Sequence, residues 1–77
     1  MTKLYKRIWY FRVRRDLQGL MRDLARNDFL PETGRFGSEV LLKFVEWGTA
    51  PQEIKMVEKE LLQVIGDRAE LLLVKGD

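Results

Sequence analysis

The chain has 77 residues, of which 45% are hydrophobic and 34% are charged, and its formal net charge is +2. This length predicts one small domain over residues 1–77, and the mixture of apolar and charged residues is typical of a folded globular protein. Cysteine and histidine are both absent, which excludes disulfides and thiolate metal sites and removes the commonest general base. We therefore expect no metal site, no cofactor and no enzymatic activity.

The apolar runs of the chain are short. Leu71–Val74 is one of the longest, whereas a membrane-spanning helix needs roughly 20 apolar residues. The N-terminal residues alternate aromatic and charged side chains, unlike the apolar region of a signal peptide. We expect a complete, cytoplasmic protein that makes no membrane contact.

Charge is distributed unevenly along the chain. Residues 1–35 hold nine Lys and Arg against four Asp and Glu, and residues 36–77 hold five against eight. This asymmetry indicates a polarised surface that attracts anions on one side. The alternative is that the two halves of the sequence do not correspond to two faces of the molecule.

The first predicted element is a strand over residues 3–14, because aromatic and β-branched side chains are frequent there. One of its faces is uniformly apolar and is expected in the core; it carries Trp9, Phe11 and Val13. The other face is mixed and carries Lys6, Ile8, Tyr10 and Arg12.

A helix is predicted to follow, with Asp16 as its N-cap. Apolar residues recur at the helical spacing i, i+3, i+4 and i+7, namely Leu17, Leu20, Met21 and Leu24. Gly19 costs this helix about 1 kcal/mol relative to alanine. The helix is expected to end at Asn27 and Asp28, and Pro31 prevents its continuation.

The next segments are less regular. Residues 29–38 contain turn signals at Pro31, Gly34 and Gly37, and a short edge strand near Asp28–Glu32 is compatible with proline. Residues 38–47 fit either a strand or a helix. The strand would place Val40, Leu42 and Phe44 on one face and Leu41, Lys43, Val45 and Trp47 on the other. The helix would use Ser38 as its cap. Two valines and two aromatic residues favour the strand.

A second helix is predicted between Gly48 and Gly66. Thr49 and Gln52 have the spacing of a capping box, Pro51 suits the first turn, and Gly66 suits the C-terminal end. Its apolar residues are Ile54, Val57, Leu61, Val64 and Ile65, whereas Glu53, Lys55, Glu58 and Lys59 are expected on a solvated face. The final segment, Ala69–Gly76, is predicted to be a strand that is apolar on both faces.

The order strand, helix, strand, strand, helix, strand predicts a ferredoxin-like β-α-β-β-α-β split sandwich. This α+β fold has a four-stranded antiparallel sheet with two helices on one face, and its first and third strands are central. The alternative is a β-α-α-α-β chain with a helix-turn-helix at residues 40–65. Its recognition helix would present more acidic than basic side chains outward, which disfavours DNA binding.

The predicted fold leaves one sheet face without helices. That face would carry the mixed side of the first strand, the second side of residues 38–47, and either Leu72 and Val74 or Leu71 and Leu73. Soluble monomers rarely leave so large an apolar patch exposed to water, so we expect a binding partner on this face. The partner could be a second copy of the chain, nucleic acid or a different protein.

If the partner is anionic, we expect it to contact the aromatic and basic residues of this face. Tyr10 and Trp47 would stack on bases while Arg12, Arg14 and Lys43 hold phosphates. The sequence thus predicts a non-enzymatic binding module, working as a dimer, whose open sheet face contacts nucleic acid or a second subunit. The alternative is a small regulator, inhibitor or adaptor that acts through protein contacts without nucleic acid.

Overall fold

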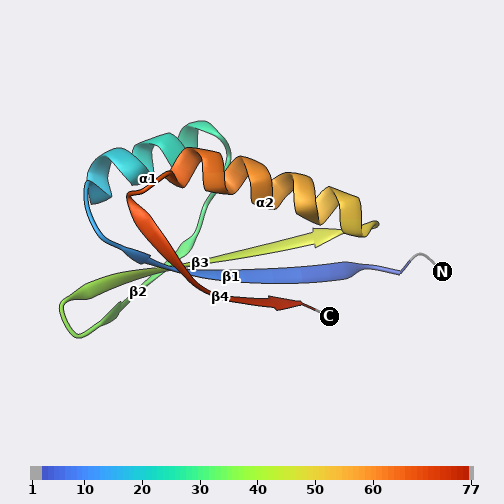
Figure 1. Ribbon diagram of the computed structural model, residues 1–77, viewed down its shortest axis with the longest axis horizontal. Coiled ribbons are helices and arrows are strands. Elements are labelled where there is room, and N and C mark those ends of the chain that lie inside the picture. The colour runs from blue at the N-terminus through green and yellow to red at the C-terminus, as the bar shows by residue number, and fades with distance from the viewer. Residues whose placement is uncertain (1–2, 77) are drawn as a thin grey trace.

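The computed structural model describes residues 3–76, which form two helices on one face of a four-stranded sheet (Figure 1). The elements are β1 (Tyr5–Val13), α1 (Leu17–Arg26), β2 (Glu32–Phe36), β3 (Glu39–Gly48), α2 (Pro51–Ile65) and β4 (Ala69–Gly76). The strand order is β2-β3-β1-β4, and every neighbouring pair is antiparallel. The predicted ferredoxin-like fold, with the first and third strands in the centre, is confirmed.

Residues 39–48 form a strand, so the helix-turn-helix alternative is wrong. β3 pairs with β1 along almost its whole length, with Trp9 opposite Phe44 and Phe11 opposite Leu42. Side chains alternate between the faces of a strand, and this register places all four of these large apolar groups on the helix-covered side. The valines and aromatic residues that favour a strand at residues 38–47 were the correct indication.

The edge strand β2 begins where the predicted edge strand was expected to end. Pairing runs from Glu32 opposite Lys43 to Phe36 opposite Glu39, so the prediction near Asp28–Glu32 is wrong. The two-residue turn between β2 and β3 sets this register, because Gly37 has a φ of 66° at the first turn position. Pro31 lies before the strand and does not decide its position.

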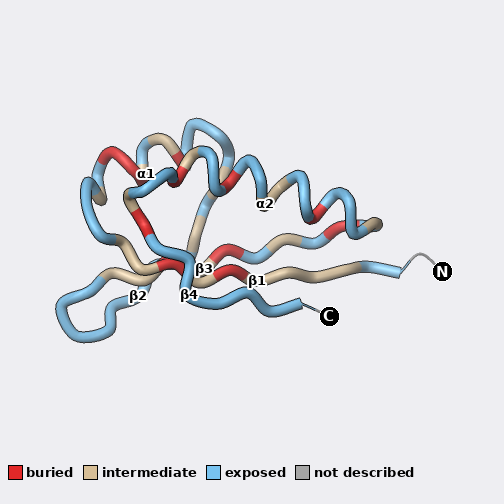
Figure 2. Tube along the Cα trace, in the orientation of Figure 1, coloured by how far each residue is buried: buried red, intermediate tan, exposed pale blue. Residues whose placement is uncertain are grey.

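The core lies between the sheet and the helices, and Figure 2 shows buried segments of both layers facing each other. Its fully buried large side chains are Trp9, Phe11, Leu20, Leu24, Leu42, Leu61 and Ile65. Phe11 and Phe44 meet edge to face, with ring centroids 5.6 Å apart. The predicted core side of β1 is confirmed: Trp9 and Phe11 are buried, and Val13 packs against the cluster.

One polar contact ties α2 to the sheet through the core. The buried Trp9 indole donates a hydrogen bond from Nε1 to Glu58 Oε2 at 2.7 Å. The same carboxylate lies 3.7 Å from Arg7 Nη1, and the Glu58 side chain is 30% exposed. The prediction of a solvated position for Glu58 is therefore wrong, because a tryptophan buried on β1 needs an acceptor for its N–H group.

The start of α1 explains its unusual glycine. Asp16 is the N-cap, as predicted, and its Oδ1 accepts a hydrogen bond from the Gly19 N–H at 3.2 Å. The Asp16 backbone is left-handed, with a φ of 52°, which folds the carboxylate over the first turn. A Cβ atom at position 19 would lie 2.7 Å from Asp16 Cγ. Glycine is therefore needed to make room for the cap.

The N-terminus of α2 differs from the expected capping box. The N-cap residue is Ala50, with Pro51 in the first turn. Glu53, rather than Gln52, bonds back to Thr49: it accepts from the backbone N–H at 2.9 Å and from the hydroxyl at 2.8 Å. These two hydrogen bonds, the backbone bond first, lower the pKa of Glu53. Within residues 3–76, neither helix is long and apolar enough to cross a membrane.

The Trp9–Glu58 bond predicts a specific loss of stability. Glu58→Ala leaves the buried indole N–H without its acceptor and should lower the free energy of unfolding by about 1–3 kcal/mol. Glu58→Gln retains an acceptor oxygen and should lose less. Lys59→Ala, at the neighbouring exposed position, is the matched control. Urea denaturation measures all three, and equal effects for Glu58→Ala and Lys59→Ala would contradict the assignment.

The fit between Gly19 and the Asp16 cap predicts that two substitutions are coupled. Glycine to alanine normally stabilises a helix interior by about 1 kcal/mol, but Gly19→Ala should bring no such gain because it displaces the cap. In the Asp16→Gly background, which keeps the left-handed backbone and removes the carboxylate, Gly19→Ala should recover the gain. Thermal unfolding of the four chains of this double-mutant cycle measures the coupling, and simple additivity would refute it.

Candidate functional site

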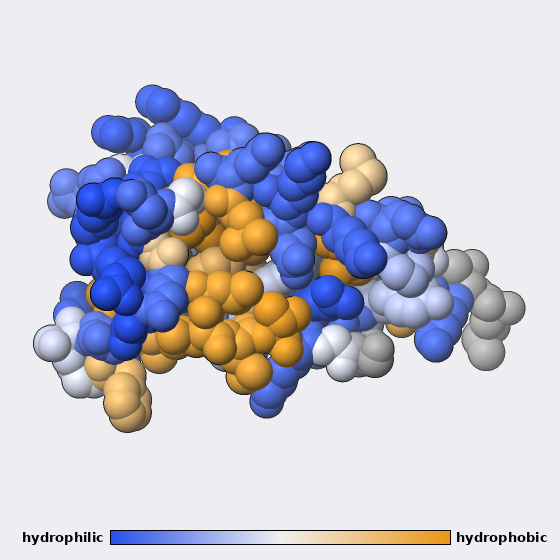
Figure 3. All heavy atoms as spheres, in the orientation of Figure 1, coloured by the Kyte–Doolittle hydropathy of each residue, from blue (hydrophilic) through white to orange (hydrophobic). Residues whose placement is uncertain are grey.

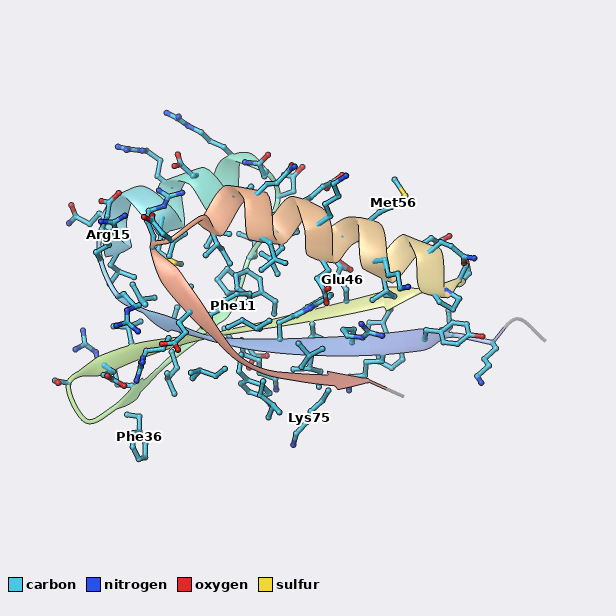
Figure 4. The ribbon with its side chains drawn as sticks, viewed as in Figure 1. Phe11, Arg15, Phe36, Glu46, Met56 and Lys75 are labelled. Atoms are coloured by element: carbon cyan, nitrogen blue, oxygen red, sulfur yellow. The ribbon has the colours of Figure 1, made fainter. Side chains whose placement is uncertain are left out.

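The sheet face opposite the helices is the candidate site, and we call it the open face. The pairing registers place on it Lys6, Ile8, Tyr10 and Arg12 of β1, Glu32, Gly34 and Phe36 of β2, Leu41, Lys43, Val45 and Trp47 of β3, and Glu70, Leu73 and Lys75 of β4. Figure 4 shows Lys75 and Phe36 pointing away from the helices, whereas Phe11 and Glu46 point toward them.

A bulge in β4 decides which of its side chains join the open face. Tyr10 lies opposite Leu73 and Phe11 lies opposite Leu71, so Leu72 is an extra residue between the two pairs. An extra residue breaks the alternation of faces. Leu73 therefore joins the open face, whereas Leu71 and Val74 lie on the helix side. Neither predicted pair joins the open face as a pair, because Leu71 and Val74 both lie on the helix side.

Apolar side chains run across the middle of the open face. Trp47 is 56% exposed, Leu73 47% and Val45 38%, and Ile8 and Tyr10 between them are half-buried. Lys6 Nζ lies 5.1 Å from the centre of the Trp47 ring. Contiguous exposed apolar area of this kind marks an interaction surface more often than a free one.

The predicted site residues occupy two separate parts of the open face. Tyr10 lies directly opposite Lys43, and Trp47 lies opposite Lys6. The Ile8–Val45 pair stands between these two aromatic residues. Arg12 lies on the far side of Tyr10, and Arg14 follows one residue beyond the end of β1. The structure therefore brings Tyr10, Lys43, Arg12 and Arg14 together and leaves Trp47 apart.

The arginines of this cluster already have an anionic partner. Glu70 of β4 accepts hydrogen bonds from Arg12 Nη2 at 2.5 Å and from Arg14 Nη1 at 2.6 Å. Arg12 Nη1 is also 3.6 Å from Glu39 Oε1. The hydrogen bond from Arg12, followed by that from Arg14, holds the pKa of Glu70 below its usual range. Sequence reasoning missed Glu70, since only the β1–β4 register brings it to Arg12.

Other basic side chains are paired in the same way. Lys43 Nζ lies 3.9 Å from Glu32 Oε2. Arg15 forms an ion pair with Asp67, which lowers the pKa of that carboxyl group. A surface pocket of 640 Å³ at this end of the sheet is lined by Arg12, Arg14 and Arg15, among others. All three of these guanidinium groups contact carboxylates.

These ion pairs explain the uneven charge of the two sequence halves. The arginines at positions 7, 12, 14 and 15 contact carboxylates at positions 39, 58, 67 and 70. In these contacts, basic side chains of the first half meet acidic side chains of the second half that come from β3, α2, β4 and the segment before β4. The asymmetry thus contributes to pairing within the chain. Among residues 3–76, no group of three or more acidic side chains is placed to hold a metal ion.

Comparisons with known proteins bear on the fold. No protein-family model matches the chain, and no curated protein matches it either. Among solved structures, the chain is similar to one described as "De novo designed protein Foldit4", with a TM-score of 0.68 and 15% sequence identity over 97% of each chain. At this identity the likeness shows a shared fold alone.

The Glu70 cluster predicts a pH-dependent contribution to stability. A carboxyl group whose pKa is lowered in the folded state stabilises the protein above its unfolded pKa, about 4.3 for glutamate, and this contribution is lost as pH falls through the folded pKa. Glu70→Gln should therefore lose less stability than wild type on acidification below about pH 5.

Chemical denaturation at a series of pH values measures this difference. Glu60→Gln is the matched control, because Glu60 is exposed on α2 and forms no ion pair within residues 3–76. Glu60→Gln should follow the wild-type curve. Parallel curves for Glu70→Gln and wild type would show that the cluster contributes nothing to acid sensitivity.

Proposed function

We propose that the protein is a non-enzymatic binding module that works as a homodimer and binds a second protein through its open face. The observation that carries this proposal is the apolar band of Trp47, Val45 and Leu73, which is exposed, whereas Arg12 and Arg14 at the end of the same face bond Glu70. The partner would present apolar side chains, together with a carboxylate within reach of Lys6. A reduced, cytoplasmic setting is part of the proposal.

The paired arginines favour a protein partner over nucleic acid. Affinity for nucleic acid comes largely from Lys and Arg side chains that neutralise phosphates. Arg12 and Arg14 both bond Glu70, so a phosphate would have to displace that carboxylate. Burial of apolar area by a protein partner needs no such exchange, because the apolar band is already exposed.

The amino-acid composition and the ion pairs of the open-face carboxylates support a binding role rather than catalysis. The chain lacks histidine and cysteine, so acid–base chemistry would depend on its carboxylates. On the open face, Glu70 bonds two arginines and Glu32 lies beside Lys43. Both groups are thus ion-pair partners within the fold.

Nucleic acid is a second candidate, and one observation favours it. Two aromatic residues of the open face have a lysine beside them: Lys43 lies opposite Tyr10, and Lys6 lies over the Trp47 ring. Alternating stacking groups and cations are typical of surfaces that bind single strands. The two candidates differ in their dependence on salt.

The proposal predicts that the open-face aromatics dominate affinity for the protein partner. Tyr10→Ala combined with Trp47→Ala should weaken binding roughly 30-fold or more, because the loss of even one buried aromatic anchor often costs about 2 kcal/mol or more. Met56→Ala is the matched control, since Met56 is apolar and exposed but points away from the sheet (Figure 4).

Affinity capture of nuclease-treated extract provides the measurement, followed by titration calorimetry with the captured protein. Circular dichroism confirms that each variant is folded. Capture retained by the double variant would overturn the open-face assignment. Capture that depends on nucleic acid, with binding to oligonucleotides that weakens steeply between about 50 and 200 mM salt, would favour the second candidate instead.

A further inference from the structure

The two edges of the sheet are built differently. β2 is short and fully exposed, and it carries Glu32, Gly34 and Arg35, the kind of edge that resists pairing with another strand. β4, the other edge, has four consecutive apolar residues, Leu71–Val74, that are 37–48% exposed. Among residues 3–76, β4 is hydrogen-bonded to β1 alone. Figure 3 shows hydrophobic surface over this strand.

The sequence of β4 is complementary to itself when read in the opposite direction. It begins with Ala69 and Glu70, continues through Leu71–Val74, and ends with Lys75 and Gly76. An antiparallel pair of such strands brings each acidic end beside the basic end of the other copy. Opposite charges directly across a strand pair stabilise it, and like charges destabilise it.

The bulge makes this pairing compatible with two-fold symmetry. A two-fold axis perpendicular to a sheet pairs only residues whose side chains lie on the same face. In a regular strand, Glu70 and Lys75 would lie on opposite faces, because an odd number of positions separates them. With Leu72 as an extra residue, Glu70 lies opposite Arg12 and Lys75 lies opposite Ile8, both on the open face.

We infer that two copies of the chain pair along β4, antiparallel and about a two-fold axis beside Leu73, and so join their sheets into one. In this register Glu70 lies opposite Lys75 of the second copy, Leu71 lies opposite Val74, and Leu73 lies opposite itself. Leu72 remains outside the pairing in each copy. A bulge often turns an edge away from partners, but here it sets the register.

The charges around the edge support this arrangement. Lys75 forms no ion pair within residues 3–76, and Figure 4 shows its side chain extending from β4 on the open side. Glu70 bonds Arg12 and Arg14 from its own copy. Lys75 of the second copy would approach it from the free edge.

Pairing along β4 specifies how the proposed homodimer forms, and it therefore rests on the proposal that the protein works as a homodimer. A two-fold axis perpendicular to the sheet leaves both open faces on the same side, so the dimer presents one continuous surface with two apolar bands. It also covers exposed apolar side chains of β4, which matters because a domain this short buries only about 60% of its unfolded surface alone. The partner would then meet two copies of the open face.

A single cysteine tests the register, because the chain has none of its own. Directly opposed residues of an antiparallel pair have Cβ atoms about 4.5–5.5 Å apart, close to the separation that a disulfide needs. Leu73→Cys should therefore form a covalent dimer under mild oxidation. Leu72→Cys is the matched control, because Leu72 is similarly exposed. It should form no covalent dimer under the same conditions. Equal cross-linking of both variants would overturn the register.

Three further variants separate edge pairing from contact between open faces. Leu71→Lys lies on the helix side of β4 and should abolish the dimer, as measured by light scattering and analytical ultracentrifugation. Val45→Lys lies on the open face, away from the edge, and should leave the dimer intact. Lys75→Glu places two carboxylates opposite each other and should weaken the dimer, most strongly at low salt.

The outcomes distinguish failure of the inference from failure of the proposed function. A dimer that survives Leu71→Lys but is lost in Val45→Lys would overturn edge pairing and leave the homodimer, formed through the open faces. A monomer at every concentration would overturn the homodimer and edge pairing together. In that case, the binding of a second protein through the open face is still decided by the Tyr10 and Trp47 variants.

Discussion

The pairing of β1 with β3 is the contact on which the rest of the structure depends. It sets Trp9 beside Phe44 and Phe11 beside Leu42, so four large side chains form one apolar layer under the helices. Because side chains alternate along a strand, the same register sends Tyr10, Lys43 and their neighbours to the other face. Core and candidate site are thus two consequences of one set of backbone hydrogen bonds.

Polar contacts then position the helices on this layer and hold the sheet together. Glu58 reaches from α2 to the buried Trp9 indole, and Asp16 caps α1 over a glycine that leaves space for it. Glu70 joins the end of β1 to β4 through two arginines. The last contact also bears on the proposed function, because it engages Arg12 and Arg14, which an anionic partner would otherwise meet.

The bulge in β4 connects the fold to its proposed assembly. It interrupts the alternation at Leu72, turns Leu73 toward the open face and brings Glu70 and Lys75 to the same side of the sheet. A regular strand of the same sequence would not be self-complementary about a two-fold axis. An irregularity of one residue therefore decides which side chains the strand presents on each face, and all four residues Leu71–Val74 are partly exposed there.

Much of the fold could be predicted because its signals are local. Strand and helix periodicities, the Asp16 cap and the Gly66 end depend on residues within a few positions of one another, and they identified four of the six elements and the core side of β1 without ambiguity. The choice of strand for residues 38–47 was correct for the same reason, since the local content of valine and aromatic residues favoured it.

What only the tertiary structure decided involves residues far apart in the sequence. The Trp9–Glu58 and Arg12–Glu70 contacts join positions separated by 49 and 58 residues, and the β4 bulge exists only relative to β1. No local pattern specifies such partners, because they depend on strand register. The sequence by itself therefore determined that a mixed, partly basic face would be left open. The fold decided that Arg12 and Arg14 are paired with Glu70 and that Trp47, Val45 and Leu73 are left exposed on that face.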